Sequence, residues 1–214
     1  MQKKYTFAKN LIGGKMNTNH HNFSDSIQSE QKNHKRADDF YLNYLQVTDI
    51  VRYNRNTEAD MKMQRSDIDV SFCRKGKYVK ISEKFRAKDF GDLYVEFYSK
   101  FPDVRGWLDK SKADYIAYFF PARIFIIDEK ALSAFYKNCL SNAISEDIFK
   151  RLIEQNPNGN AQKPALIKIL DNSYKIQIIQ AYNQTEDASW YTMGIAVPFK
   201  ILADFDIYCK EFGF

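Results

Sequence analysis

Two acidic residues, Asp69 and Glu83, lie inside segments whose residue patterns are typical of β-strands. Successive residues of a strand face opposite sides, so Glu83 shares a face with apolar neighbours at even spacings. These neighbours are Val79, Ile81 and Phe85. A carboxylate buried among such residues is costly unless it pairs with a cation, such as an arginine, or binds a metal ion. The sequence leaves both explanations open for Glu83.

The turn between the two strands determines whether Asp69 lies beside Glu83. A two-residue turn at Lys75 and Gly76 would place Asp69 opposite Ser82. This turn needs a positive φ angle at Lys75, which is unfavourable for a residue with a Cβ atom.

A three-residue loop over residues 74–76 needs a positive φ angle only at Gly76, so we prefer it. In that register Asp67 lies opposite Glu83, and Asp69 lies on the same face. Two carboxylates on neighbouring strands then converge, which is the arrangement that a hard divalent cation with oxygen ligands requires.

The distribution of histidine excludes several kinds of catalytic centre from most of the chain. All three histidines precede residue 37, and they are His20, His21 and His34. Ser-His-Asp triads, Cys-His dyads and histidine-ligated zinc or haem are therefore excluded after that residue. Catalysis there must use carboxylates, lysine, tyrosine or cysteine.

The three cysteines are Cys73, Cys139 and Cys209, and they form no CxxC pair. An odd count of cysteines without a secretory signature predicts a cytoplasmic protein with reduced thiols.

The positive charge is concentrated at the beginning of the chain. The formal net charge is +5, from 32 Lys and Arg against 27 Asp and Glu, and residues 1–36 carry the whole excess. Residues 13–36 are also rich in Asn, His, Ser, Gln and Lys. We therefore expect 1–36 to be a flexible basic leader that could add salt-dependent affinity for DNA.

No apolar run approaches the roughly 20 residues of a membrane span, so we expect no membrane partner.

The elements that must position the acidic residues follow from periodicity and turn signals. We expect helices at 37–48, 57–63, 106–112, 129–140, 145–155 and 198–210. We expect strands at 67–74, 77–86, 93–99, 114–121, 123–128, 174–182 and 190–197. Three sequential strands followed by a crossover helix predict a mixed sheet flanked by helices, in an α/β or α+β fold.

Residues 37–128 resemble the PD-(D/E)XK nuclease superfamily. The resemblance rests on an acidic helix residue, on Asp69 at the beginning of a strand, and on the run Ser-Glu-Lys-Phe-Arg at 82–86 in the next strand. Further matching stretches are Gly91-Asp92, Gly106-Trp107 and Lys112-Ala113-Asp114-Tyr115. The resemblance implies a restriction endonuclease-like core over 37–128. Residues 129–214 would then be an α/β elaboration packed on the core, used for substrate choice or for forming a homodimer.

The resemblance also implies a mechanism. Two carboxylates hold one or two Mg²⁺ or Mn²⁺ ions, a lysine orients or deprotonates water, and the water displaces the leaving group of a DNA phosphodiester in line. In this sequence Asp69 matches the first acidic ligand and Glu83 the second. Glu58, on the preceding short helix, matches an accessory acidic position, and Lys84 is the candidate lysine. RNA is the alternative substrate of the same fold.

The lysine departs from the family pattern, which places it two residues after the acid, where this chain has Phe85. In a regular strand Lys84 faces away from Glu83. A bulge could turn Lys84 round, Ser82 and Lys84 could occupy the two motif positions, or Lys112 could supply the ammonium. The departure leaves a second function open, namely a nuclease-like module that binds nucleic acid or assembles without catalysis.

Residues around this motif allow two interpretations each. Asp92 and Glu96 could extend a metal site or form an exposed polar strand face. Trp107 could stack on a base or anchor the core. Basic residues near the motif could contact phosphates or form a solvated surface; they are Arg86, Lys88, Arg105, Lys110 and Lys112.

Overall fold

Two β-sheets form the framework of the protein. The computed structural model describes residues 23–54 and 56–213. The first sheet, sheet A, contains in spatial order β1 (Thr48–Arg52), β2 (Val70–Arg74), β3 (Lys77–Phe85), β6 (Tyr115–Phe119), β7 (Arg123–Asp128) and β11 (Cys209–Gly213). Its neighbours are antiparallel except β3 and β6, which are parallel.

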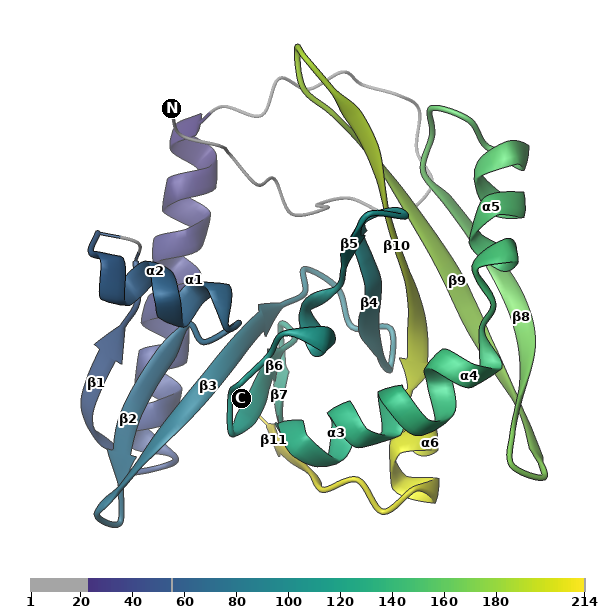
Figure 1. Ribbon diagram of the computed structural model, residues 1–214. Coiled ribbons are helices and arrows are strands. Elements are labelled where there is room, and N and C mark those ends of the chain that lie inside the picture. Colours follow the sequence, from purple (N-terminus) through teal and green to yellow (C-terminus); the bar gives the residue numbers. More distant parts are fainter. Residues whose placement is uncertain (1–22, 55, 214) are drawn as a thin grey trace.

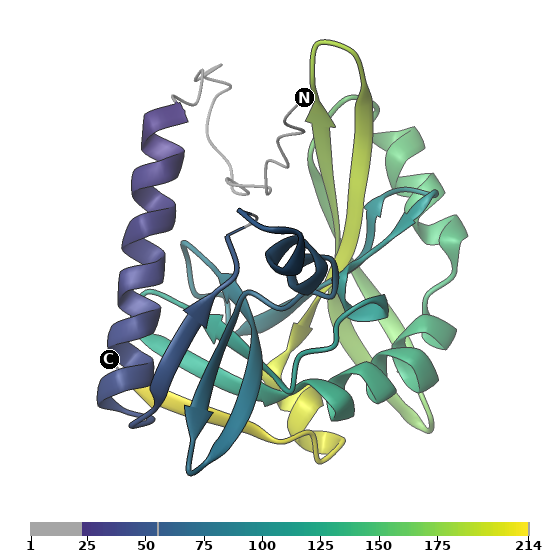
Figure 2. The ribbon, with the colours of Figure 1, turned by 60° about the vertical axis from the view of Figure 1, so that its left-hand side comes forward.

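The second sheet, sheet B, is antiparallel throughout. Its spatial order is β5 (Val104–Arg105), β4 (Asp92–Lys100), β10 (Ser189–Pro198), β9 (Asn172–Gln184) and β8 (Ala161–Ile169). The hairpin of β9 and β10 extends beyond the rest of the sheet, at the top of Figures 1 and 2. Two sheets with helices confirm the expected mixed α and β class.

The helices lie before, between and after the strands. In chain order they are α1 (Phe23–Asn43), α2 (Glu58–Arg65), the 3₁₀ turn η1 (Trp107–Asp109), α3 (Glu129–Phe135), the π-helical turn η2 (Tyr136–Leu140), α4 (Ser141–Ala143), α5 (Glu146–Gln155) and α6 (Phe199–Asp204). Figure 2 shows α1 along sheet A on the side away from sheet B. Within the described ranges, no helix is long and apolar enough to cross a membrane.

A smaller hydrophobic core joins α1 to one face of sheet A. Phe40 and Tyr41 of α1 are fully buried there against Phe72, Ile81 and Phe119 of the sheet. The Phe40 ring meets that of Phe119 edge-on, with centroids 6.1 Å apart. Burial of each such side chain contributes about 1.5–3 kcal/mol, so α1 fixes this face of the sheet.

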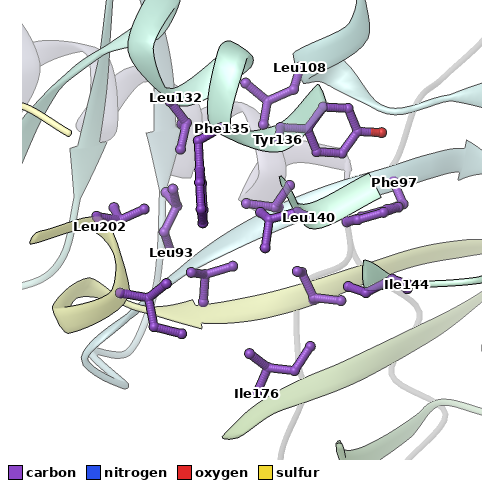
Figure 3. Close-up of a cluster of buried hydrophobic side chains, with 14 of the residues drawn as sticks. Leu93, Phe97, Leu108, Leu132, Phe135, Tyr136, Leu140, Ile144, Ile176 and Leu202 are labelled. Atoms are coloured by element: carbon purple, nitrogen blue, oxygen red, sulfur yellow. The ribbon is translucent and has the colours of Figure 1, made fainter. Parts of the chain in front are cut away.

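A larger core fills the space between the opposite face of sheet A, sheet B and the later helices. Figure 3 shows Leu93 and Phe97 of β4 pointing toward Phe135 of α3 and Leu140 of η2, with Ile176 of β9 below them. Alternate residues of β3 therefore face two different environments. One set faces the α1 core, and the other faces sheet B.

The turn between β2 and β3 is the two-residue turn, so the preference for a three-residue loop is wrong. Arg74 pairs with Lys77, and Lys75 and Gly76 have φ angles of 51° and 75°. This geometry matches the right-handed twist of the strands. A left-handed conformation at a residue with a Cβ atom costs about 1–2 kcal/mol of free energy. The regular pairing of β2 with β3 outweighs this cost. The pairing of Val70 with Ile81 extends to place Asp69 beside Ser82.

The expected composition of the three-strand meander is also wrong. The meander consists of β1, β2 and β3, whereas the predicted strand 93–99 is β4 and pairs with β10 in sheet B. After β3 the chain forms β4, β5 and η1, and it returns to sheet A as β6. Sheet B therefore includes strands from within 37–128, and sheet A includes β11 from within 129–214.

Both ends of the described chain differ from the predicted elements. The expected helix over 37–48 begins at Phe23, so residues 23–36 of the predicted leader are helical, and residues 1–22 lie outside the description. The periodicity of apolar residues does not reveal this part of the helix, because residues 23–36 are mostly polar and project beyond the sheet (Figure 2). The expected helix over 198–210 ends at Asp204, and the chain then pairs as β11 with β7.

Candidate functional site

Glu83 lies on the α1 face of β3, and both of its carboxylate oxygens accept hydrogen bonds from other side chains. Its side chain is 2% exposed. Arg52 donates from Nη1 to Oε2 over 2.8 Å and from Nη2 to Oε1 over 3.1 Å. The Tyr41 hydroxyl donates to Oε1 over 2.8 Å. Of the two explanations left open by the sequence, the structure shows the buried pair with an arginine.

Arg52 completes this arrangement through a second carboxylate. Its Nε and Nη2 atoms donate to Asp38 Oδ1 over 3.0 and 2.8 Å. Burial alone would lower the pKa of Arg52, but its hydrogen bonds to Glu83 and Asp38 raise it. Burial and the adjacent Glu83 carboxylate raise the pKa of Tyr41 well above its usual value. These groups hold α1 and β1 against β3.

The opposite face of β3 carries a different cluster, made of Ser82, Lys84 and Asp67. Lys84 Nζ donates to Asp67 Oδ1 over 2.8 Å and to Ser82 Oγ over 2.7 Å. Ser82 Oγ donates to Asp67 Oδ2 over 2.7 Å. The side chains of Lys84 and Asp67 are 15% and 12% exposed. As expected for a regular strand, Lys84 faces away from Glu83, and it shares a face with Ser82.

The charge state of Lys84 follows from its surroundings. Burial lowers its pKa, but the charges of Asp67 and Asp69 more than offset this effect, so its pKa lies above the usual value. Lys84 is therefore an ammonium ion at neutral pH. It can hold an anionic group in place, but it cannot accept a proton.

Asp69 lies at the edge of the same cluster. Its Oδ2 accepts a hydrogen bond of 2.7 Å from the backbone N–H of Glu83. Burial raises the pKa of Asp69 to about 6; the nearby Lys84 opposes this rise and Asp67 adds to it. A carboxyl group that titrates so near neutrality is a common property of functional sites.

The chain between α2 and β2 brings Asp67 and Asp69 together. The backbone N–H of Ile68 returns to Met63 at the end of α2 over 3.1 Å, and Asp67 adopts a left-handed φ of 55°. The Asp69 N–H then joins the β3 ladder through Ile81 over 2.9 Å. The predicted strand 67–74 thus begins at Val70, and both aspartates precede it.

Trp107 covers one side of the cluster. It is 6% exposed, and Lys84 Nζ lies 4.9 Å from the centre of its ring. A Cβ atom at Gly106 would overlap the backbone oxygen of Glu96, so glycine permits this approach of η1 to β4. Trp107 therefore anchors the core and shields the ammonium, and its ring is too buried to stack on a base.

Glu96 on β4 is a further carboxylate near the cluster. Burial raises its pKa, while the charges of Lys84 and Lys110 oppose the rise and Asp67 adds to it. Across the part of the chain that the structure describes, its carboxylate forms no hydrogen bond or ion pair. From the sequence, Glu96 is a candidate only for an extension of the site, and Asp67 is predicted opposite Glu83 and not beside Lys84. The signal for Asp67 was its position two residues before Asp69.

Glu58 and Lys112 lie outside the cluster. Glu58 is the exposed first residue of α2, where it complements the helix N-terminus. The exposed Lys112 donates its backbone N–H to Ser66 over 2.9 Å. In the described ranges neither side chain forms a hydrogen bond or ion pair with Asp69 or Lys84.

Comparisons of the chain with protein-family models, curated proteins and solved structures found no match.

Proposed function

We propose that this chain is a metal-dependent nuclease that hydrolyses phosphodiester bonds of DNA. The observation that carries the proposal is the cluster of Lys84, Asp67 and Asp69 on the face of β3 toward sheet B. A fixed cation beside carboxylates suits a reaction in which negative charge develops on a phosphoryl group.

The order of the elements also supports the proposal. Along the chain, α1 is followed by the antiparallel strands β1, β2 and β3, with α2 between β1 and β2, and β6 then pairs parallel with β3. The PD-(D/E)XK resemblance implies a helix, a three-strand meander, a helix and a strand, and this chain has β4, β5 and the three-residue turn η1 in place of the second helix. Asp69, Ser82 and Lys84 then stand at the motif positions, and Ser82 replaces the second acid.

A divalent cation suits the donor chemistry of this cluster. Asp67 and Asp69 offer carboxylate oxygens, which Mg²⁺ and Mn²⁺ prefer. Among the residues that the structure describes, no three His, Cys, Asp or Glu side chains are placed to hold an ion together. Mg²⁺ is commonly held by one or two carboxylates, while water and substrate phosphate complete its shell. We assign Asp69 as the first ligand and Asp67 as the second, in place of Glu83.

Each residue of the cluster then has a separate task. A bound ion stabilises charge on the phosphoryl oxygens and lowers the pKa of water. The Lys84 ammonium orients anionic oxygens in the site, and Asp67 and Ser82 hold its Nζ atom in place. The Asp69 carboxyl group binds the cation in its ionised form. Trp107 excludes water from one side of Lys84.

Cleavage of supercoiled and linear DNA with Mg²⁺ or Mn²⁺, against EDTA, tests the proposal. We expect Asp69→Asn and Lys84→Met to reduce the rate on the order of 10²–10³-fold. Glu83→Gln is the matched control, because it changes the other face of β3 and should retain cleavage in the folded fraction. Equal cleavage by wild type and Asp69→Asn would contradict the proposal. Competition between duplex DNA and structured RNA identifies the preferred substrate.

One observation favours a second function, a nucleic-acid-binding module without catalysis. Asp67 already pairs with Lys84, so a cation must compete with that ammonium for its oxygens. Calorimetric titration with Mn²⁺ separates the two functions. Binding that is lost in Asp69→Asn supports the nuclease, whereas DNA binding without any Mn²⁺ binding supports the module.

A further inference from the structure

Arg86 continues the row of side chains that contains Ser82 and Lys84. It follows the last residue of β3, and its backbone N–H donates to Phe119 over 2.8 Å, which extends the pairing of β3 with β6. Because alternate residues of a strand share a face, Arg86 lies on the same side as Lys84, about 7 Å along the strand. Its position therefore belongs to the surroundings of the proposed site.

Two aromatic rings hold the Arg86 guanidinium. Its Cζ atom lies 5.4 Å from the centre of the Tyr94 ring and 5.9 Å from that of Phe90. The Tyr94 ring packs against the backbone of β10 at Gly194, where an added Cβ atom would come within 2.7 Å of the ring. The side chain of Arg86 is partly buried. Contact with the packed ring of Tyr94 restricts the rotamers of Arg86 before any ligand arrives.

The guanidinium of Arg86 has no hydrogen-bonded partner within the described residues. Asp92 is near enough for the Arg86 charge to oppose the burial-driven rise in its pKa. Among the described residues no ion pair joins Arg86 and Asp92, and the buried Asp92 Oδ1 has no hydrogen-bond partner there. Within that part of the chain, the N–H donors of the Arg86 guanidinium are therefore unused.

Other arginines that stack on aromatic rings are paired. Arg105 lies over Tyr98 at 4.5 Å and pairs with Glu146 at 3.8 Å. Arg123 stacks on Phe125 at 4.9 Å and forms ion pairs with two carboxylates. Arg36 donates to backbone oxygens near the end of β6. Arg86 thus combines a guanidinium that packs on Tyr94 with donors that find no acceptor among the described residues, which is the arrangement suited to an incoming anion.

We propose that Arg86, held by Tyr94 and Phe90, binds a backbone phosphate of the nucleic acid next to the one at Lys84. This inference rests on the proposed function. A planar guanidinium can donate two parallel hydrogen bonds to a phosphate, which a lysine cannot do. Binding of the neighbouring phosphate fixes the position of the strand along β3 and contributes no base recognition.

Fluorescence anisotropy with labelled duplex and single-stranded DNA, in EDTA and over a salt series, tests the inference. We expect Arg86→Ala to weaken binding about tenfold. The slope of log K against log salt should fall in magnitude by about one. Arg86→Lys should restore the slope but only part of the affinity. Tyr94→Phe should bind as wild type, and Tyr94→Leu should bind more weakly because it lacks the ring face.

Arg105→Ala is the matched control, because it removes an arginine, on β5 of sheet B, that also packs on an aromatic ring but is paired with Glu146. Circular dichroism and the melting temperature establish that each variant is folded. If Arg86→Ala binds with the affinity and slope of wild type, this inference is overturned while the nuclease proposal stands. If wild type binds neither duplex nor single-stranded DNA, both proposals fall.

Discussion

The two faces of β3 carry buried charges that are built in different ways. On the α1 face, Glu83 accepts hydrogen bonds from Arg52 and Tyr41, and Arg52 is also bound by Asp38. Both oxygens of Glu83 accept hydrogen bonds, and these partners belong to α1 and to β1 of sheet A. This pair has no free capacity for a ligand.

The face toward sheet B keeps such capacity. Lys84 is held by Asp67 and Ser82, but burial raises the pKa of Asp69 to about 6, and the Glu96 carboxylate forms no hydrogen bond or ion pair with any described residue. A buried charge in an apolar row is therefore not by itself evidence of a site. The ion-paired Glu83 stabilises the fold, whereas Asp69 and Glu96, which form no ion pair within the described residues, are the groups available for chemistry.

The largest expected effect comes from breaking the pair on the α1 face. Arg52→Met leaves Glu83 buried without its cation, so we expect a loss of about 3–5 kcal/mol in the free energy of unfolding. Urea denaturation followed by circular dichroism measures it. The double variant Arg52→Met/Glu83→Gln should recover part of the loss, since it removes the uncompensated charge.

The same double variant sharpens the comparison, because it leaves the other face of β3 unchanged. Its folded fraction should still cleave DNA and bind Mn²⁺. A loss below about 1 kcal/mol in Arg52→Met, within the range of an exposed pair, would contradict the structural role assigned to Glu83.

A smaller effect is expected where η1 meets β4. Gly106→Ala places a methyl group against the backbone of Glu96, so η1 must shift and move Trp107 away from Lys84. We expect a loss of about 1–3 kcal/mol in stability together with slower cleavage. Val104→Ala, at an exposed residue nearby, is the control and should change neither. Wild-type stability in Gly106→Ala would show that η1 can move freely.

Local patterns predict the elements whose sequences carry their own signals. The strand 123–128 is found at its predicted bounds, and the row of Glu83 with Val79, Ile81 and Phe85 faces one core as expected. Partners distant in the sequence could not be predicted. β1 and β11 are short edge strands that exist through their pairing with β2 and β7.

The site could be predicted only in part for the same reason. Asp69 and Lys84 are found in one cluster, but the partner of Glu83 is Arg52, which lies 31 residues earlier. The position of Asp67 depends on a left-handed residue and on the turn at Lys75, where tertiary contacts outweigh backbone preference. The backbone preference against a positive φ angle at Lys75 therefore predicted the wrong register.

The smallest expected effect is the pH dependence of cleavage, which distinguishes the two faces of β3. A cation needs the ionised form of Asp69, whose pKa is raised by burial to about 6. Mn²⁺ affinity and the cleavage rate should therefore be nearly constant above pH 7 and fall about tenfold per unit below pH 6. Because the folded pKa exceeds the unfolded one, ionisation of Asp69 opposes folding as pH rises, and protonation relieves this cost. Asp69→Asn should thus cleave on the order of 10²–10³-fold more slowly than wild type, yet be at least as stable at pH 8. A variant that loses stability there would place Asp69 with Glu83 among the structural charges.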